Sequence, residues 1–206
     1  MARKVYGHVI NRDGSIAGRV ADMGGASMSS AVSINIDTRR IDALADRFRA
    51  IAIRDSGGIV RALNRTATET RTAMTRALVK QTGIKHAVVR RQLTVDNASR
   101  GSLTAVIKAK GGFQSLKDTG ARQTKKGVSA APWGKRRVFP GTFIIGRYGG
   151  NVYKRTSKKR FPLHKLFGPA IPREFPKDQS KAAFDATVPA VLAKRLEHEL
   201  SRLLSR

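Results

Sequence analysis

The sequence predicts an α+β fold: long N-terminal helices packed on an antiparallel β-sheet, a C-terminal helix and an extended N-terminal β-hairpin arm. Apolar residues recur every three or four positions in residues 59–81 and again in 184–203. Between these segments they occur in short runs separated by glycine, proline and polar residues, as in strands. The chain has 206 residues, 40% of them hydrophobic, which is enough for one core of domain size. We therefore expect residues 1–30 to form the arm and its linker, and residues 31–206 to form a single domain.

The arm is predicted from two alternating runs, residues 5–11 and 15–22, that flank a turn. Asp13 and Gly14 in this turn tolerate positive φ angles, as a tight β-hairpin requires. Residues 23–30 are rich in glycine, serine and methionine and have little to bury, which favours a flexible linker. An isolated hairpin is marginally stable. It is therefore expected to order against another surface or, equally, to be an edge hairpin of the same domain.

The next segment predicts one strand and two helices. Residues 31–37 alternate as in a short strand, and Asp37 or Thr38 then serves as the N-cap of a helix. Ser56, Gly57 and Gly58 are expected to break or kink this helix, and a second helix is expected from Ile59 to about Gln81. The expected buried stripe of the second helix includes small residues, which allow close packing: Ile59, Leu63, Ala67, Thr70, Met74, Ala77 and Leu78.

Glycine and proline mark the remaining boundaries. Gly83 is expected to end the second helix, because the left-handed residue after a helix favours glycine. A short helix over 84–91 follows, and from residue 92 onward the pattern is typical of an antiparallel sheet. The C-terminal helix is expected to take Thr187 as its N-cap, with Pro189 in its first turn or at a kink.

The strongest signal for function is charge. The chain carries 41 Lys and Arg against 14 Asp and Glu, a formal net charge of +27. Residues 119–173 contain no acidic side chain but 14 basic ones. A compact segment that cannot neutralise its own charge creates a positive field, which nucleic acid or an acidic protein surface relieves. The sequence therefore indicates a binding partner rather than a reaction.

Residue types for catalysis or metal binding do not gather in the sequence. The four histidines are His8, His86, His164 and His198. Glu197 is adjacent to the last of these, but neighbouring residues point in different directions on a helix. The lack of cysteine excludes disulfides, thiol catalysis and cysteine-based zinc sites. We expect no enzymatic activity, no cofactor and no metal. No apolar run approaches the roughly 20 residues of a membrane span, so a soluble protein without a membrane partner is expected.

Aromatic residues interleave with the basic ones. Trp133, Tyr148 and Tyr153 stand near lysines and arginines, as in proteins that stack single-stranded bases on rings. The alternative, that these rings belong to the core or to a protein interface, stays open because only 6% of the residues are aromatic. The run GRYGGN, residues 146–151, lacks the spacing of a phosphate-binding loop and is better explained as a hairpin turn. The predicted polyanion surface consists of Arg122, Lys125, Lys126, Lys135, Arg136, Arg137, Lys154, Arg155, Lys158, Lys159 and Arg160.

Two stretches carry a resemblance to a known family. The first is RALNRTATETRTAM (61–74) followed by TGIKHAVVRRQL (82–93). The second is GTFI (141–144), NVYKRT (151–156) and FPLHKLFGPAIPREF (161–175). In this order the segments resemble the prophage minor tail protein Z family, the tail completion proteins of lambda-like phages. The resemblance covers roughly residues 56–205 and leaves out the segment before residue 31.

The resemblance implies a structural virion protein of the neck, where the tail tube meets the head connector. It implies a homo-oligomeric ring, expected to be hexameric, that is made in the host cytoplasm. The implied partners are tail terminator, tail tube and head-connector proteins, with phage DNA in the lumen contacted without sequence readout. Protein interfaces are expected on the arm and on residues 161–169: Val5, Tyr6, Val9, Ile16, Val20, Phe161, Pro162, Leu163, Leu166, Phe167, Gly168 and Pro169.

A second class of function stays open, a ribosomal or nucleoid-type RNA- or DNA-binding protein, for which a strongly basic chain is ordinary. Against it, the charge lies on predicted strands beside a long helix of small residues, and no signature of an RNA-binding module is present. A nuclease would need a carboxylate cluster that the sequence lacks. The virion protein therefore ranks first.

Overall fold

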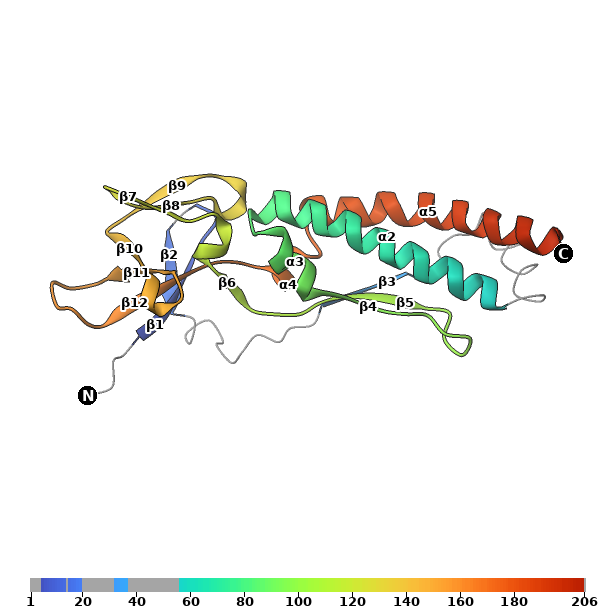
Figure 1. The fold of residues 1–206 in the computed structure, drawn as a ribbon, viewed down its shortest axis with the longest axis horizontal. Helices are drawn as coiled ribbons and strands as arrows, with labels where there is room; N and C mark the ends of the chain where they lie inside the picture. The colour runs from blue at the N-terminus through green and yellow to red at the C-terminus, as the bar shows by residue number, and fades with distance from the viewer. Residues whose placement is uncertain (1–4, 14, 20–31, 37–55, 206) are drawn as a thin grey trace.

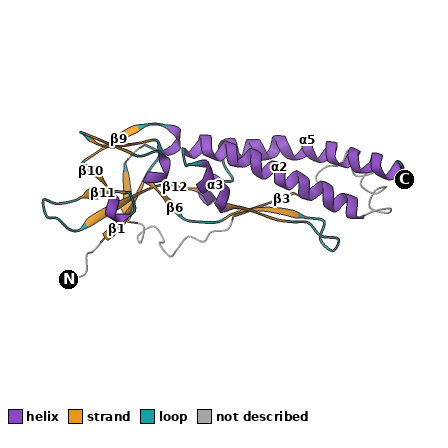
Figure 2. Cartoon of the chain, in the orientation of Figure 1, coloured by secondary structure: helices purple, strands orange, loops and turns teal. Residues whose placement is uncertain are grey.

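The computed structural model describes residues 5–13, 15–19, 32–36 and 56–205. These residues form an elongated molecule in which two long helices lie side by side along its long axis (Figure 1). Most strands gather at the end remote from the C-terminus, so helices and strands are largely segregated (Figure 2). This arrangement confirms the predicted α+β class.

The longest elements are helices α2 (Ser56–Thr82) and α5 (Asp178–Leu204), each of 27 residues. They run antiparallel, because Arg61 near the start of α2 pairs with Glu199 near the end of α5. Their facing sides supply much of the first hydrophobic core: Ile59, Leu63, Ala67, Met74, Leu78, Leu192 and Leu196. The predicted stripe of α2 is thus confirmed, except that Ala77 is only half-buried.

A three-stranded antiparallel sheet packs against α2. Its strands, in spatial order, are β3 (Val32–Ile36), β5 (Ala105–Ala109) and β4 (Leu93–Asp96). In the central strand Ala105, Ile107 and Ala109 are buried and join the core of the helices. The short helix α3 (His86–Gln92) leads directly into β4. Alternation along β5 therefore gives this sheet one face toward the helices.

A six-stranded sheet forms most of the other end of the molecule. Its order is β10-β11-β12-β1-β2, and β6 also pairs with β12. The strands are β1 (Val5–Ile10), β2 (Ile16–Arg19), β6 (Phe113–Ser115), β10 (Thr142–Ile145), β11 (Asn151–Arg155) and β12 (Leu163–Ala170). Strand β1 runs parallel to β12, and the remaining pairs are antiparallel. The N-terminal hairpin is therefore part of this sheet.

A further antiparallel sheet contributes residues to a second hydrophobic core. Its strands are β7 (Arg122–Thr124), β8 (Gly127–Ala130) and β9 (Arg137–Pro140). Short helical turns join the strands: η3 (Leu116–Thr119), η4 (Pro132–Gly134), η5 (Gly146–Tyr148) and, after β12, helix α4 (Ile171–Glu174). The core itself consists of Ile10, Leu116, Val128, Ala130, Phe139, Val152 and Leu166.

The structure corrects several expected boundaries. Ser56 is already helical, so the glycine pair expected to precede α2 lies in its first turn. Helix α5 begins at Asp178, so Thr187 is not its N-cap, and Pro189 lies inside the helix on an exposed side. In place of the expected single antiparallel sheet, the described strands form three sheets, one of them mixed. The helix expected over 38–51 falls outside the described residues.

Gly83 ends α2 as predicted, with a φ of +70° and its N–H donating to the Val79 carbonyl oxygen at 2.9 Å. A Cβ at this position would lie 2.0 Å from the Ala131 carbonyl oxygen. We expect Gly83→Ala to lower the free energy of unfolding by ~2 kcal/mol or more, because backbone strain and a clash both oppose the side chain. Chemical denaturation measures this. Gly101→Ala is the matched control, since a Cβ there meets nothing within 4 Å; equal losses in both variants would contradict the explanation.

Glu199 is only 3% exposed between the long helices, and Arg61 Nη2 donates to its Oε2 at 2.8 Å. The hydrogen bond from Arg61 holds the pKa of Glu199 below its ordinary value of 4.5. A depressed folded-state pKa means that the ionised carboxylate stabilises the fold. This stabilisation is complete above pH 4.5 and is lost as the pH falls through the folded-state pKa.

We accordingly expect Glu199→Gln to lower the free energy of unfolding by ~1–3 kcal/mol at neutral pH, because it removes a charge-assisted hydrogen bond from a buried site. The difference from the wild type should shrink as the pH falls below 4.5. Urea denaturation across this pH range measures the trend, with the exposed neighbour Glu197→Gln as control. A difference that does not vary with pH would rule out the ion pair as its cause.

Candidate interaction surface

The acid-free stretch, residues 119–173, builds the β-rich end of the molecule, from the end of η3 through β12 (Figure 1). Its apolar residues supply five of the seven buried residues of the second core, and most of its cations lie on the outside. Nine members of the predicted polyanion surface are exposed: Arg122, Lys125, Lys126, Lys135, Arg136, Arg155, Lys158, Lys159 and Arg160. Arg137 and Lys154 are half-buried.

Two of these arginines interact with polar groups of their own chain. Arg136 Nη1 donates to the Gly120 carbonyl oxygen and to Ser129 Oγ, each at 3.3 Å. Arg137 lies close enough to Asp13 to help lower the pKa of that carboxyl, behind the larger effect of hydrogen bonds from Ser15. By contrast, the lysine pairs in the β7–β8 turn and in the β11–β12 loop form no ion pair within the described part of the chain. These two loops are the best placed to meet a polyanion.

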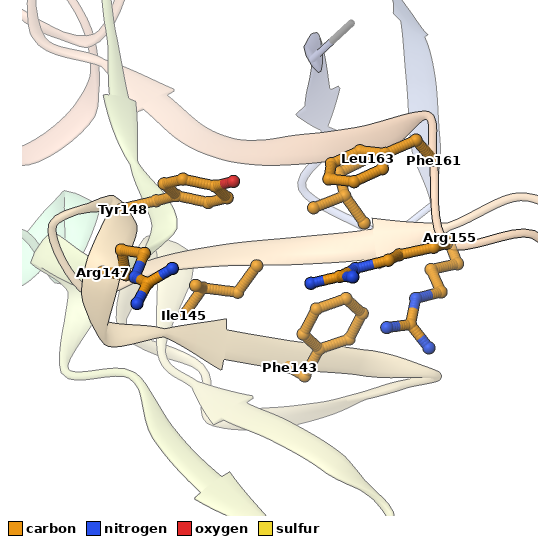
Figure 3. Close-up of a pocket in the computed structure, with 8 residues that line it drawn as sticks. Phe143, Ile145, Arg147, Tyr148, Arg155, Phe161 and Leu163 are labelled. Carbon is orange, nitrogen blue, oxygen red and sulfur yellow. The ribbon is translucent and has the colours of Figure 1, made fainter. Parts of the chain in front are cut away.

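A pocket of about 320 Å³ lies on the face of the sheet formed by β10, β11 and β12 (Figure 3). The strand register puts Arg155 opposite Leu163, and Phe143 opposite Tyr153. Side chains directly opposite in an antiparallel pair share one face of the sheet. The residues that line the pocket are Phe143, Ile145, Arg147, Tyr148, Arg155, Arg160, Phe161 and Leu163.

Arginines and rings contact one another in this pocket. The Arg155 guanidinium carbon lies 4.9 Å from the ring centroid of Phe143, and that of Arg160 lies 6.0 Å from the ring of Phe161. The first distance is typical of a cation–π contact, which holds the guanidinium over the ring while its N–H groups remain able to bind an anion. Of the rings singled out in the sequence, Tyr148 lines this pocket with Phe143 and Phe161, whereas Tyr153 is buried. Trp133 lines a different pocket, beside Lys80 and Lys135. Alternation of Phe143 and Ile145 along β10 was the signal that could have found the pocket around Phe143.

Two histidines that are far apart in the sequence meet on adjacent strands. The ring nitrogens His164 Nδ1 and His8 Nε2 form a hydrogen bond, and the ring centroids are 4.5 Å apart. Strands β1 and β12 bring them together, so sequence spacing gave no sign of the contact. In the part of the chain that the structure describes, no three metal-binding side chains gather.

The turn of the N-terminal hairpin is fixed to the start of α5. Arg12 Nη2 donates to Glu174 Oε2 at 3.0 Å and to Asp178 Oδ2 at 2.6 Å. The hydrogen bond to Asp178 raises the pKa of Arg12, so the guanidinium stays charged. Gln81 Nε2 at the end of α2 also donates to Glu174 Oε2, at 3.2 Å. This cluster joins the hairpin to both long helices, and nothing in the sequence pattern indicated it.

The predicted protein-interface residues of β12 fall into two groups. Leu163, Leu166, Gly168 and Pro169 are buried within the chain itself. The half-buried ones are Phe161, Pro162 and Phe167. In addition, Lys165 Nζ lies 4.9 Å from the ring centroid of Phe167, and burial lowers the pKa of that lysine. On the arm, Val5, Tyr6, Val9 and Ile16 lie in β1 and β2, while Val20 lies outside the described residues.

The fold and this surface define an α+β protein with exposed cations and a pocket of rings and arginines. Comparison with protein families gives a match to prophage minor tail protein Z over residues 56–206. The chain belongs to this family, which confirms the resemblance seen in the sequence. It is therefore a structural protein of a phage tail, located in the virion, where it contacts other virion components.

Further comparisons add nothing to this assignment. No curated protein and no solved structure matches the chain. Among the described helices, none is both long enough and apolar enough to cross a membrane.

Proposed function

We propose that the protein is a tail completion component of the neck. It forms a homo-oligomeric ring that joins the tail tube to the head connector, with its basic surface facing phage DNA or acidic partner rings. The observation that carries this proposal is the set of exposed cations on the β-rich end, with no carboxylate in residues 119–173 to neutralise them. Membership of a phage tail protein family supports a position in the tail.

Contacts with phosphate suit this surface. The lysines of the β7–β8 turn and of the β11–β12 loop are exposed, and an ammonium group binds phosphate as a point charge without reading bases. Such contacts release counterions and weaken steeply with salt. Contacts of this kind would allow DNA of any sequence to pass through a ring.

Ring formation requires further surfaces. Among the described strands β2 pairs only with β1, so its outer edge is available to a strand of a neighbour. We propose that residues 1–30 reach a neighbouring copy as an arm, while β1 stays paired with β12 of the domain formed by residues 31–206, and that six copies close the ring. Its neighbours are the tail terminator, tail tube and head-connector proteins. Half-buried Phe161 and Phe167 contribute apolar contacts to these interfaces.

Reversal of four loop charges tests the DNA contact. In the variant with Lys125, Lys126, Lys158 and Lys159 each changed to Glu, we expect affinity for duplex DNA to fall and the slope of log affinity against log salt to decrease by about 3 to 4. Infectivity of the phage should be lost while the melting temperature is kept, because all four side chains are exposed.

The matched control reverses four exposed lysines outside the acid-free stretch, namely Lys85, Lys110, Lys177 and Lys194. It makes the same change in net charge and should retain most of the affinity and infectivity. Full infectivity of the loop variant would remove the role given to the basic surface. The RNA-binding alternative predicts a different result. The purified protein would stay monomeric when mixed with its tail partners, yet would bind structured RNA at nanomolar affinity in physiological salt.

A further inference from the structure

We propose that the pocket between β10, β11 and the start of β12 receives a segment of another virion protein that presents an apolar side chain flanked by carboxylates. This inference rests on the proposed function, since it names a partner chemistry for one part of the same basic surface. It separates that surface into two: exposed lysine loops that suit DNA, and a pocket that suits protein.

The apolar floor of the pocket argues against duplex DNA as its occupant. Phe143, Ile145, Tyr148 and Phe161 are half-buried and line the pocket together with Leu163 (Figure 3). A duplex presents phosphates and sugars to such a surface, and its bases are stacked away from the rings. A volume of about 320 Å³ is instead at the lower end of the range that encloses small ligands and single side chains.

The charge of the pocket selects an acidic partner. Arg147, Arg155 and Arg160 place three guanidiniums at an apolar floor. No described residue forms an ion pair with any of them, and the nearest acids in the sequence are Asp118 and Glu174. A guanidinium next to apolar surface binds a carboxylate in a fork of two N–H donors, more strongly than one in open water.

The described carboxylates of a second copy are poorly suited to this role, because most of them are already paired within their own chain. The internal pairs are Glu69 with Arg195, Asp96 with Lys108, Glu174 and Asp178 with Arg12, Asp185 with Lys181, and Glu199 with Arg61. A different and more acidic chain is the better match by charge complementarity.

The partner is held by its side chains rather than by strand addition. Strand β10 is the end strand of the sheet, but the Ile144 N–H already donates to Gln123 Oε1 at 2.9 Å. This contact from β7 covers part of the edge that an added strand would need. Recognition therefore depends on one inserted apolar side chain and the carboxylates beside it.

Photo-crosslinking in the assembled particle tests the occupant. With p-benzoylphenylalanine in place of Phe143, we expect irradiation to link the protein to another virion protein at a segment rich in Asp or Glu. The same photo-reactive residue in place of Lys126, which is exposed and outside the pocket, is the control and should not give that product. Products with DNA or with a second copy, or no product at position 143, would overturn the proposal. Absence of the chain from the particle would instead overturn the proposed function.

Binding of a synthetic peptide of the cross-linked segment then tests the chemistry. We expect Phe143→Ser and Arg155→Gln each to weaken peptide binding about tenfold or more, with Lys126→Gln within about twofold of the wild type. Phe143→Leu should bind nearly as well as the wild type, which separates loss of the apolar contact from damage to the sheet. Phe143→Ser should leave affinity for a short DNA duplex unchanged. Equal loss of DNA and peptide binding, or equal binding of a peptide with Asn and Gln for its acids, would overturn the proposal.

Discussion

Strand β12 is the constraint on which the rest of the molecule depends. It pairs with β11, with β1 and with β6, and it continues through α4 into α5, the helix that packs along α2. Six of its eight residues, Leu163 to Ala170, are buried, and Leu166 lies in the second core. The strand therefore cannot shift by one position without turning Leu166 to the opposite face of the sheet. This fixed ladder lets the loops on either side carry a dense positive charge. Their mutual repulsion acts on exposed side chains, whereas the fold is held by hydrogen bonds and burial beneath them.

Sequence patterns predicted the features of the fold that depend only on residues close together in the sequence. The buried stripe of α2, the left-handed Gly83 and the alternation of β3 were readable because each follows from a period of 3.6 or 2 or from one backbone angle. The parallel pairing of β1 with β12 was not. His8 and His164 are separated by 156 positions, and no local pattern records which distant strand an edge will accept. The start of α5 was misplaced because proline normally marks a boundary. Pro189 lies on an exposed side, where water can satisfy the carbonyl that its missing N–H leaves unpaired.

The candidate interaction surface was likewise predictable only in part. Its charge was evident from composition alone, since no fold can hide so many cations in an acid-free stretch of 55 residues. The roles of single residues needed the structure. Arg136 donates hydrogen bonds to the Gly120 carbonyl and the Ser129 hydroxyl of its own chain. Arg155 instead lies over the ring of Phe143 and lines the pocket. The sequence predicts the same polyanion-binding role for both residues, because both are arginines in one basic stretch. Their different surroundings follow from the pairing of β10 with β11, which the run itself does not encode.

On the proposed function, the two parts of this surface respond differently to salt. Phosphate contacts made by the exposed lysine loops depend on counterion release and fade as ionic strength rises. A partner seated on Phe143 and Phe161 also buries apolar area, and salt does not screen that contribution to binding. The protein contact would therefore persist under conditions that release the DNA contact. A neck component needs this combination, because it must stay attached to its neighbours while the genome moves past it. The cluster of Phe143 and Phe161 with arginines lies apart from the lysine pairs of the two loops, so the two kinds of contact can respond to salt separately.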